Sequence, residues 1–143
     1  MAEEWHRGDY VISTDPSMLD VDAVHGFLRR SYWATERPLE VVKRSVEGSL
    51  NFGLYRAKDR RQVGFARVVT DFATFAWLCD VFIDEAYRGQ GLGVWLTETV
   101  VEHPELRCLR LWVLGTDDAH GLYEKMGFTA LGAPEKWMEK RGC

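Results

Sequence analysis

The sequence has few of the features that would place it outside the ordinary soluble globular proteins. It contains only three cysteines and four prolines in 143 residues. The cysteines (Cys79, Cys108, Cys143) form no C-x-x-C pair, which argues against a disulfide framework or a zinc site. No stretch reaches the ~20 apolar residues of a membrane-spanning helix. Residues 1–10 (MAEEWHRGDY) contain no apolar run typical of a signal peptide. We therefore expect a cytoplasmic protein with reduced thiols and no membrane partner.

An excess of positive charge and a pair of ligand-spaced histidines are missing as well. The 18 basic and 22 acidic residues give a net charge of −4, which argues against a nucleic-acid partner because such a surface must be basic. No two histidines have metal-ligand spacing, so no metal is expected. The 46% hydrophobic and 28% charged residues are typical of a folded globular protein. A chain of this length fits one domain, residues 1–143.

The hydrophobic pattern predicts a mixed α/β fold around a mostly antiparallel sheet. Three consecutive segments joined by short turns predict an antiparallel meander, and apolar residues at helical spacing predict four helices. The expected strands cover residues 9–13, 50–57, 62–70, 74–84 and 109–114, with two more short strands within 129–140, about seven in all. The expected helices cover residues 18–32, 39–48, 92–103 and 118–126.

Glycine is abundant, with 13 residues, and three glycines lie together where an apolar strand meets a helix. The strand Val81-Phe82-Ile83-Asp84 leads to the loop Arg88-Gly89-Gln90-Gly91-Leu92-Gly93. N–H groups at a helix N-terminus carry partial positive charge, and glycine lets the backbone approach a phosphate closely. The loop lacks the Gly-Lys-Ser/Thr of a Walker loop and the G-x-G-x-x-G of a dinucleotide site. It is interpreted as an anion-binding cradle, the alternative being a simple connecting turn.

At these residues the sequence resembles the GCN5-related N-acetyltransferases (GNAT). The loop matches that family's pyrophosphate-binding pattern Q/R-x-x-G-x-G/A at each fixed position. The resemblance implies a GNAT-like sheet that splays between its fourth and fifth strands, here 74–84 and 109–114. It also implies that the Val81-Phe82-Ile83 segment binds the pantetheine arm of acetyl-coenzyme A. The loop from Arg88 to Gly93, including Gln90 and Leu92, would bind the pyrophosphate.

A second segment, Leu122-Tyr123-Glu124-Lys125-Met126-Gly127-Phe128, matches the family pattern L-Y-x-x-x-G-F. The resemblance makes Tyr123 the candidate general acid that protonates the leaving thiolate, a role that a phenol with a pKa near ~10 can fill. The alternative is a tyrosine that only packs in the core. The family often has an asparagine seven residues before this tyrosine, where this chain has Thr116, so the resemblance suggests only a weaker coenzyme contact there.

The acceptor side of the site is less well defined by sequence. Asp80 lies within an apolar strand, where a carboxylate must be paired or face a cleft. It is a candidate general base or amine anchor, with a structural carboxylate as the alternative. Trp33, Tyr32 and Phe75 are candidate substrate-binding aromatics.

The resemblance, together with the chemistry of the loop, implies transfer of an acetyl group to a primary amine of a small molecule, amino acid or peptide. The amine would attack directly, with a strand N–H near Val81 polarising the thioester carbonyl. The alternatives are a non-catalytic acyl-coenzyme A sensor and an enzyme that uses a longer acyl donor. A homodimer is possible by analogy with the family.

Overall fold

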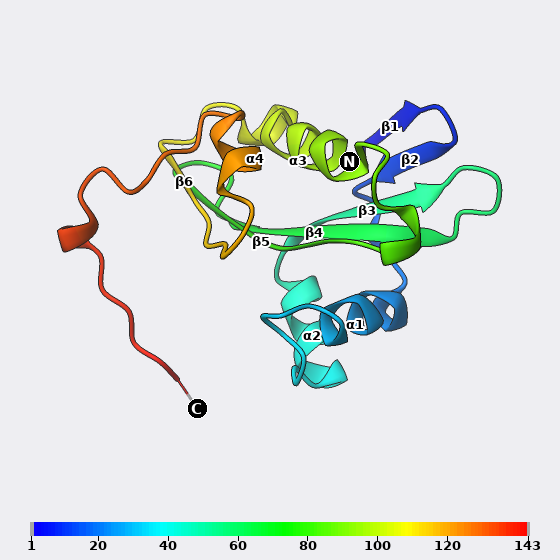
Figure 1. The fold of residues 1–143 in the computed structure, drawn as a ribbon, viewed down its shortest axis with the longest axis horizontal. Helices are drawn as coiled ribbons and strands as arrows, with labels where there is room; N and C mark the ends of the chain where they lie inside the picture. The colour runs from blue at the N-terminus through cyan, green and yellow to red at the C-terminus, as the bar shows by residue number, and fades with distance from the viewer. Residues whose placement is uncertain (1, 143) are drawn as a thin grey trace.

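The computed structural model describes residues 2–142 and is built around one six-stranded sheet with helices on both faces (Figure 1). The strands lie side by side in chain order, antiparallel except for β6, which runs parallel to β5. The predicted fold class, a mostly antiparallel sheet with about four helices, is confirmed. The strands are β1 (Glu4–Arg7), β2 (Tyr10–Ser13), β3 (Leu50–Arg56), β4 (Gln62–Thr70), β5 (Phe75–Ile83) and β6 (Leu111–Val113). The α-helices are α1 (Val21–Arg29), α2 (Leu39–Glu47), α3 (Leu92–Val101) and α4 (His120–Glu124).

Two expectations at the ends of the chain are wrong. The polar segment 4–7 forms β1 by pairing with β2 across a turn at Gly8, whose φ is +55°. The two strands expected within 129–140 do not form, and this stretch contains only a short 3-10 turn, Pro134–Lys136. The sheet therefore has six strands rather than about seven.

The first helix is also shorter than expected. Asp20 is extended, and its side chain accepts a hydrogen bond from the Ala23 N–H, which fixes the start of α1 at Val21. Residues 16–18, expected near the start of this helix, form a separate 3-10 turn that Asp15 caps. A short polar side chain thus starts each of the two elements, and the single helix expected over 18–32 is divided.

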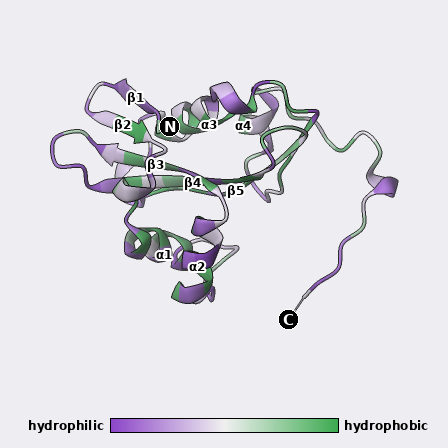
Figure 2. Ribbon diagram, turned by 180° about the vertical axis from the view of Figure 1, so that it is seen from behind, coloured by the Kyte–Doolittle hydropathy of each residue, from purple (hydrophilic) through white to green (hydrophobic). Residues whose placement is uncertain are grey.

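The core consists of two apolar clusters, one on each face of the sheet. Leu92, Trp95 and Leu96 of α3 pack on one face, and Figure 2 shows green, hydrophobic stretches along this helix. On the other face, Val24 and Phe27 of α1 join Val42 of α2, Phe65 and Phe82. Each fully buried side chain of this size contributes about 1.5–3 kcal/mol. None of the helices within residues 2–142 has the length and apolarity that crossing a membrane requires.

Two irregularities of β5 create the space for a site. It pairs with β6 only from Phe75 to Trp77, so the rest of its edge is open toward the segment that follows β6. Its register with β4 shifts between the Phe65–Phe82 and Arg67–Cys79 pairs. Two β5 residues, Asp80 and Val81, therefore lie opposite one residue of β4, which is a β-bulge. Asp80 adopts a left-handed conformation there, with φ +54°.

Candidate active site

The glycine-rich loop forms one end of a groove of about 730 Å³. Gly89 and Gly91 have φ of +85° and +78°, and a Cβ on either would enter open space at the loop surface. Gly91 is the N-cap of α3 and provides no side-chain cap, so the first N–H groups of the helix are free of an internal acceptor. An anionic ligand can therefore reach bare backbone N–H groups at a helix N-terminus, which is the arrangement that suits a phosphate.

Positive side chains surround this end of the groove. The Arg88 Nε donates to the Ile83 carbonyl at 2.9 Å, and its guanidinium lies over the Phe82 ring at 4.9 Å from the centroid. Arg30 and Lys125 line the same groove, although Arg30 is paired with Glu85 at 3.0 Å. The local charge is therefore basic even though the whole chain carries a net charge of −4.

The structure brings most of the predicted coenzyme-binding residues together. Residues that line the groove are Val81, Phe82, Ile83, Arg88, Gly89, Gly91, Leu92 and Gly93. Gln90 does not line it, because its side chain donates to the Tyr87 carbonyl and accepts from the Tyr10 hydroxyl. Thr116 lies on the neighbouring cavity instead. Its hydroxyl accepts from the Ala119 N–H at 3.2 Å, at the start of α4.

A second cavity of about 590 Å³ lies where β5 and β6 separate. Its walls are the bulged part of β5, the loop between α1 and α2, and the segment Leu114–Ala119 that follows β6. Val81 and Tyr123 line both cavities, as do Tyr32 and Trp33. The two spaces therefore meet at the β5 bulge, beside the tyrosine of α4.

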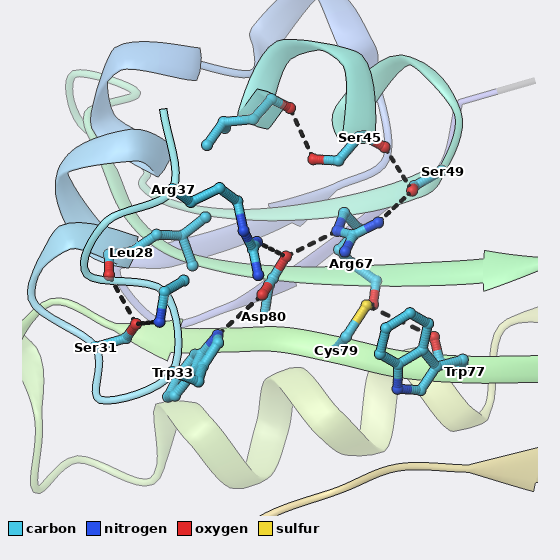
Figure 3. Close-up of polar contacts among 12 residues, drawn as sticks. Leu28, Ser31, Trp33, Arg37, Ser45, Ser49, Arg67, Trp77, Cys79 and Asp80 are labelled. Atoms are coloured by element: carbon cyan, nitrogen blue, oxygen red, sulfur yellow. Dashed lines mark hydrogen bonds and ion pairs between the residues drawn. The ribbon is translucent and has the colours of Figure 1, made fainter. Parts of the chain in front are cut away.

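Asp80 is buried beside this cavity, and both of its carboxylate oxygens accept hydrogen bonds from neighbouring side chains (Figure 3). One carboxylate oxygen, Oδ2, accepts from Arg37 Nη1 and from Arg67 Nε, each at 2.8 Å. The other, Oδ1, accepts from the Trp33 indole N–H at 2.9 Å. Asp80 thus links the loop after α1 to the middle of β4, and it holds Trp33 in the cavity wall.

The electrostatics of Asp80 favour a structural role over that of a general base. Burial alone would raise the pKa of its carboxyl group, but the hydrogen bond and charge of Arg67, together with the charge of Arg37, hold the pKa below its usual range. A carboxylate with a lowered pKa is a weak proton acceptor. Of the alternatives open for Asp80, the geometry favours a group that orients its neighbours.

Tyr123 lies on α4 and is only 8% exposed. Burial, with the nearby Tyr32 and Asp118, raises the pKa of its phenol to about 12. Its ring packs edge-on against Phe128, at 5.9 Å between centroids. Gly127, with φ +96°, ends this helical turn and lets Phe128 fold back. The Tyr123 hydroxyl has no hydrogen-bond partner among residues 2–142, so it can donate its proton to a ligand.

Two of the three predicted acceptor-site aromatics line the cavity, and the third does not. Tyr32 and Trp33 line the cavity, with rings edge-on at 4.9 Å between centroids. The Tyr32 hydroxyl accepts from the Asp117 N–H at 2.9 Å, which joins the two loops across the cavity mouth. Phe75 lines neither cavity, since it is the first residue of β5 and lies far along the strand from the bulge at Asp80 and Val81.

Arg37 and Arg67 are among the cavity residues that the sequence did not predict. They line the same space as Asp80. An arginine inside the apolar run of β4 is a signal that could have indicated Arg67, because a buried charge needs a partner. Within residues 2–142, no group of three or more His, Cys, Asp or Glu side chains is placed to hold a metal ion.

Comparison with known proteins agrees with this geometry. The family model described as an acetyltransferase (GNAT) domain matches residues 51–130. The chain belongs to the GNAT acetyltransferase family. Among the curated relatives of this GNAT protein is one from Gibberella zeae with an inferred acetyltransferase function, 34% identical over 147 residues, or 87% of this chain and 82% of the relative.

Solved structures of other acetyltransferases have the same fold as this GNAT protein. A GNAT-family protein of Xanthomonas campestris pv. campestris with an inferred acetyltransferase function is 43% identical, with a TM-score of 0.89 and 96% of each chain covered. The ribosomal-protein-S18-alanine N-acetyltransferase of Escherichia coli is 25% identical, with a TM-score of 0.68 over 84% of this chain and 77% of its own. These relatives indicate a transferase of acetyl groups.

Proposed function

We propose that this GNAT protein transfers an acetyl group from acetyl-coenzyme A to a primary amine of a small molecule, amino acid or peptide. The observation that carries the proposal is the meeting of the two cavities at Val81 and Tyr123. One cavity ends in a basic, glycine-lined helix N-terminus suited to a pyrophosphate, and the other is lined by aromatic and charged side chains suited to a small amine.

The chemistry of the residues that line the groove supports coenzyme binding. The N–H groups at the start of α3 and Arg88 would bind the pyrophosphate, and the open edge of β5 from Val81 to Ile83 would face the pantetheine arm. Acetyl-coenzyme A, when bound, supplies the activated acetyl thioester. A backbone N–H at the β5 bulge, near Val81, would polarise the thioester carbonyl.

Tyr123 would complete the transfer. The neutral acceptor amine would attack the thioester carbonyl from the cavity side, and the carbon–sulfur bond would break as the tyrosine hydroxyl donates its proton to the leaving sulfur. The proton lost by the acylated nitrogen would return to the tyrosine oxygen through solvent. Since its pKa is raised to about 12, the hydroxyl stays protonated throughout the neutral range. Asp80 would act indirectly, by fixing Trp33 and Arg37 in the wall where the acceptor binds.

Release of free thiol from acetyl-coenzyme A in the presence of an amine panel tests this function. The expected result is thiol release that depends on the amine, with an acetylated product seen by mass spectrometry. Coenzyme binding without thiol release for any amine would favour the non-catalytic sensor. Thermal-shift competition between acetyl- and longer acyl-coenzymes distinguishes the donor.

A valine in place of Gly91 is expected to raise the KM for acetyl-coenzyme A by about tenfold. The branched side chain would stand over the N–H groups of α3, and loss of a hydrogen bond to a charged group has an effect of this size. Gly8→Val is the matched control, because Gly8 also has positive φ but lies in the β1–β2 turn. Both variants should lose about 1–2 kcal/mol of stability to backbone strain. An unchanged coenzyme KM in Gly91→Val would contradict the role of the loop.

A homodimer is the second part of the proposal, supported by the C-terminal segment 129–142, which extends away from the sheet (Figure 1). Leu131, Trp137 and Met138 of this segment are 44%, 45% and 96% exposed. Within residues 2–142, no strand pairs with the outer edge of β6. An exposed apolar segment and an open edge on each copy can be covered by a two-fold exchange.

Light scattering is expected to give twice the chain mass for the wild-type protein. The double variant Trp137→Ser, Met138→Ser should be a monomer at the same concentration, since most of the apolar contact is removed. Val41→Ser, which alters an apolar residue of similar exposure (48%) on α2, should remain a dimer. A monomeric wild-type protein would exclude the exchange.

A further inference from the structure

The cavity of about 590 Å³ at the β5 bulge, here called the acceptor cavity, is lined by two arginines and one buried carboxylate. The positive charges of the two arginines exceed the single negative charge of the carboxylate. Arg67 comes from the middle of β4 and Arg37 from the loop between α1 and α2, and both bind the same oxygen of Asp80 (Figure 3). Their side chains are only 10% and 24% exposed. Two positive charges and one negative charge leave this cluster with one positive charge, which in a partly buried place needs a partner.

The unused donors of this cluster belong mainly to Arg37. Arg67 also donates from Nη1 to the Ser49 hydroxyl at 3.0 Å. Arg37 donates only through Nη1, and its Nε and Nη2 have no acceptor among residues 2–142. Because Arg37 lines the cavity and is the more exposed of the two, its free donors are those that a ligand can reach. A guanidinium in this situation suits a carboxylate, which it binds with strong, directional hydrogen bonds.

The segment after β6, which forms another wall of this cavity, carries negative charge. Asp117 and Asp118, in the segment before α4, line the same cavity, and the charge of Asp118 is close enough to Tyr123 to raise its pKa. The indole rings of Trp33 and Trp77 line the cavity as well, and aromatic faces attract an ammonium group. A ligand with an amine and a carboxylate could thus place its amine on the tyrosine side and its carboxylate on the arginine side.

We propose that the acceptor is an amine that also carries a carboxylate, an amino acid or a short peptide, and that Arg37, supported by Asp80 and Arg67, binds this carboxylate. This inference rests on the proposed acetyl transfer and narrows it. Arg37 is then a specificity-determining residue, because it distinguishes the acid from its uncharged analogue at a distance from the reacting atoms.

The test compares matched acceptors with the wild-type protein. Each standard amino acid is assayed beside its primary amide, and phenylalanine also beside 2-phenylethylamine, at saturating acetyl-coenzyme A. The kcat/KM of the preferred acid is expected to exceed that of its amide by about tenfold to a hundredfold, the usual effect of a charge-assisted hydrogen bond. Amides and simple amines accepted as well as the acids would overturn the proposal and leave acetyl transfer intact. No thiol release from any member would instead contradict the proposed function.

Variants of Arg37 locate the effect. In Arg37→Gln the preference for the acid should fall to about twofold or less, mainly through a higher KM, and Arg37→Lys should retain part of it. Arg44→Gln, an exposed arginine of α2, should leave the preference unchanged. Thermal shifts with the same acid and amide pairs give a reading that does not need turnover, and melting temperatures show whether each variant is folded. An equal loss for acid and amide in Arg37→Gln would overturn the assignment.

Discussion

Replacing Tyr123 with phenylalanine is expected to lower kcat by about a hundredfold with little change in the KM of either substrate. Removing the hydroxyl takes away only the proton donor, and general acids contribute about 10²–10⁴ in rate. A thiolate is a fairly good leaving group, so the low end of that range applies. The ring, which packs against Phe128, is kept. Thiol release at saturating acceptor measures the effect.

Tyr55→Phe is the control for this experiment. Tyr55 is buried in the core, and its hydroxyl has no hydrogen-bond partner among residues 2–142. Its removal should therefore leave kcat unchanged and cost no stability. An unchanged kcat in Tyr123→Phe would exclude the acid role and return Tyr123 to the packing residue that its sequence pattern also allows.

The pH profile gives an independent reading of the same residue. The raised pKa of Tyr123, about 12, means that the acid form persists up to pH 10. The wild-type kcat should therefore show no loss of a catalytic acid below pH 10, and Tyr123→Phe should lower the profile without changing its shape. A decline centred well below pH 10 that disappears in Tyr123→Phe would show that the tyrosine titrates in a more polar setting.

The parts of the fold that local patterns determine were predicted well. The bounds of β4 agree residue for residue with the expected 62–70, and β5 differs by one residue at each end. Both strands are bounded by polar turns and belong to one meander, so the short turn between them sets how they pair. The strand β1 was missed although Gly8-Asp9 between Arg7 and Tyr10 is a hairpin turn signal. The tail strands failed because a strand must also lie beside a free edge, and this segment extends away from the open edge of β6.

The candidate site shows the same difference between residues that a local motif indicates and residues that only the fold brings together. The loop from Arg88 to Gly93 and Tyr123 each belong to a continuous motif, so the sequence alone indicated them. Arg37 and Arg67 lie 30 residues apart and meet at Asp80 only because β4 pairs with β5 and the loop after α1 folds over them. Phe75 follows the same alternation as Trp77, and both pair with β6, but of the two it is Trp77, two residues nearer the bulge, that lines the cavity. Which aromatic reaches the cavity thus depends on its distance from the bulge, which local sequence does not specify.

Asparagine at position 80 is expected to lower the free energy of unfolding by about 3–5 kcal/mol, the usual effect of removing one partner from a buried ion pair. The positive charges of Arg37 and Arg67 would then lack the negative charge of the carboxylate that both side chains bind. Asparagine tolerates the left-handed conformation at this position as well as aspartate does, so the change isolates the charge. Urea unfolding followed by tryptophan fluorescence measures the loss.

The control for Asp80 is an ion pair of the same kind on the surface. Asp59→Asn removes the partner of Arg56 at an exposed turn and should change the stability very little, because water screens exposed pairs. The double variant Asp80→Asn, Arg67→Gln should lose less than the sum of its single variants, since the second change removes one of the uncompensated charges. Equal losses in Asp59→Asn and Asp80→Asn would show that burial does not strengthen the inner pair.

The dependence of this stability on pH follows from the direction of the Asp80 shift. Its pKa is lower in the folded state than in the unfolded chain, where an aspartate has a pKa near ~3.9. The stabilisation is therefore fully present above that unfolded value and is lost as the pH falls through the lower, folded value. Wild type and Asp80→Asn should differ by a constant amount from pH 8 to about pH 5, and the difference should shrink in stronger acid. A difference that disappears already near pH 6 would mean that Asp80 takes up a proton near neutrality, and the carboxylate would then again be a candidate general base.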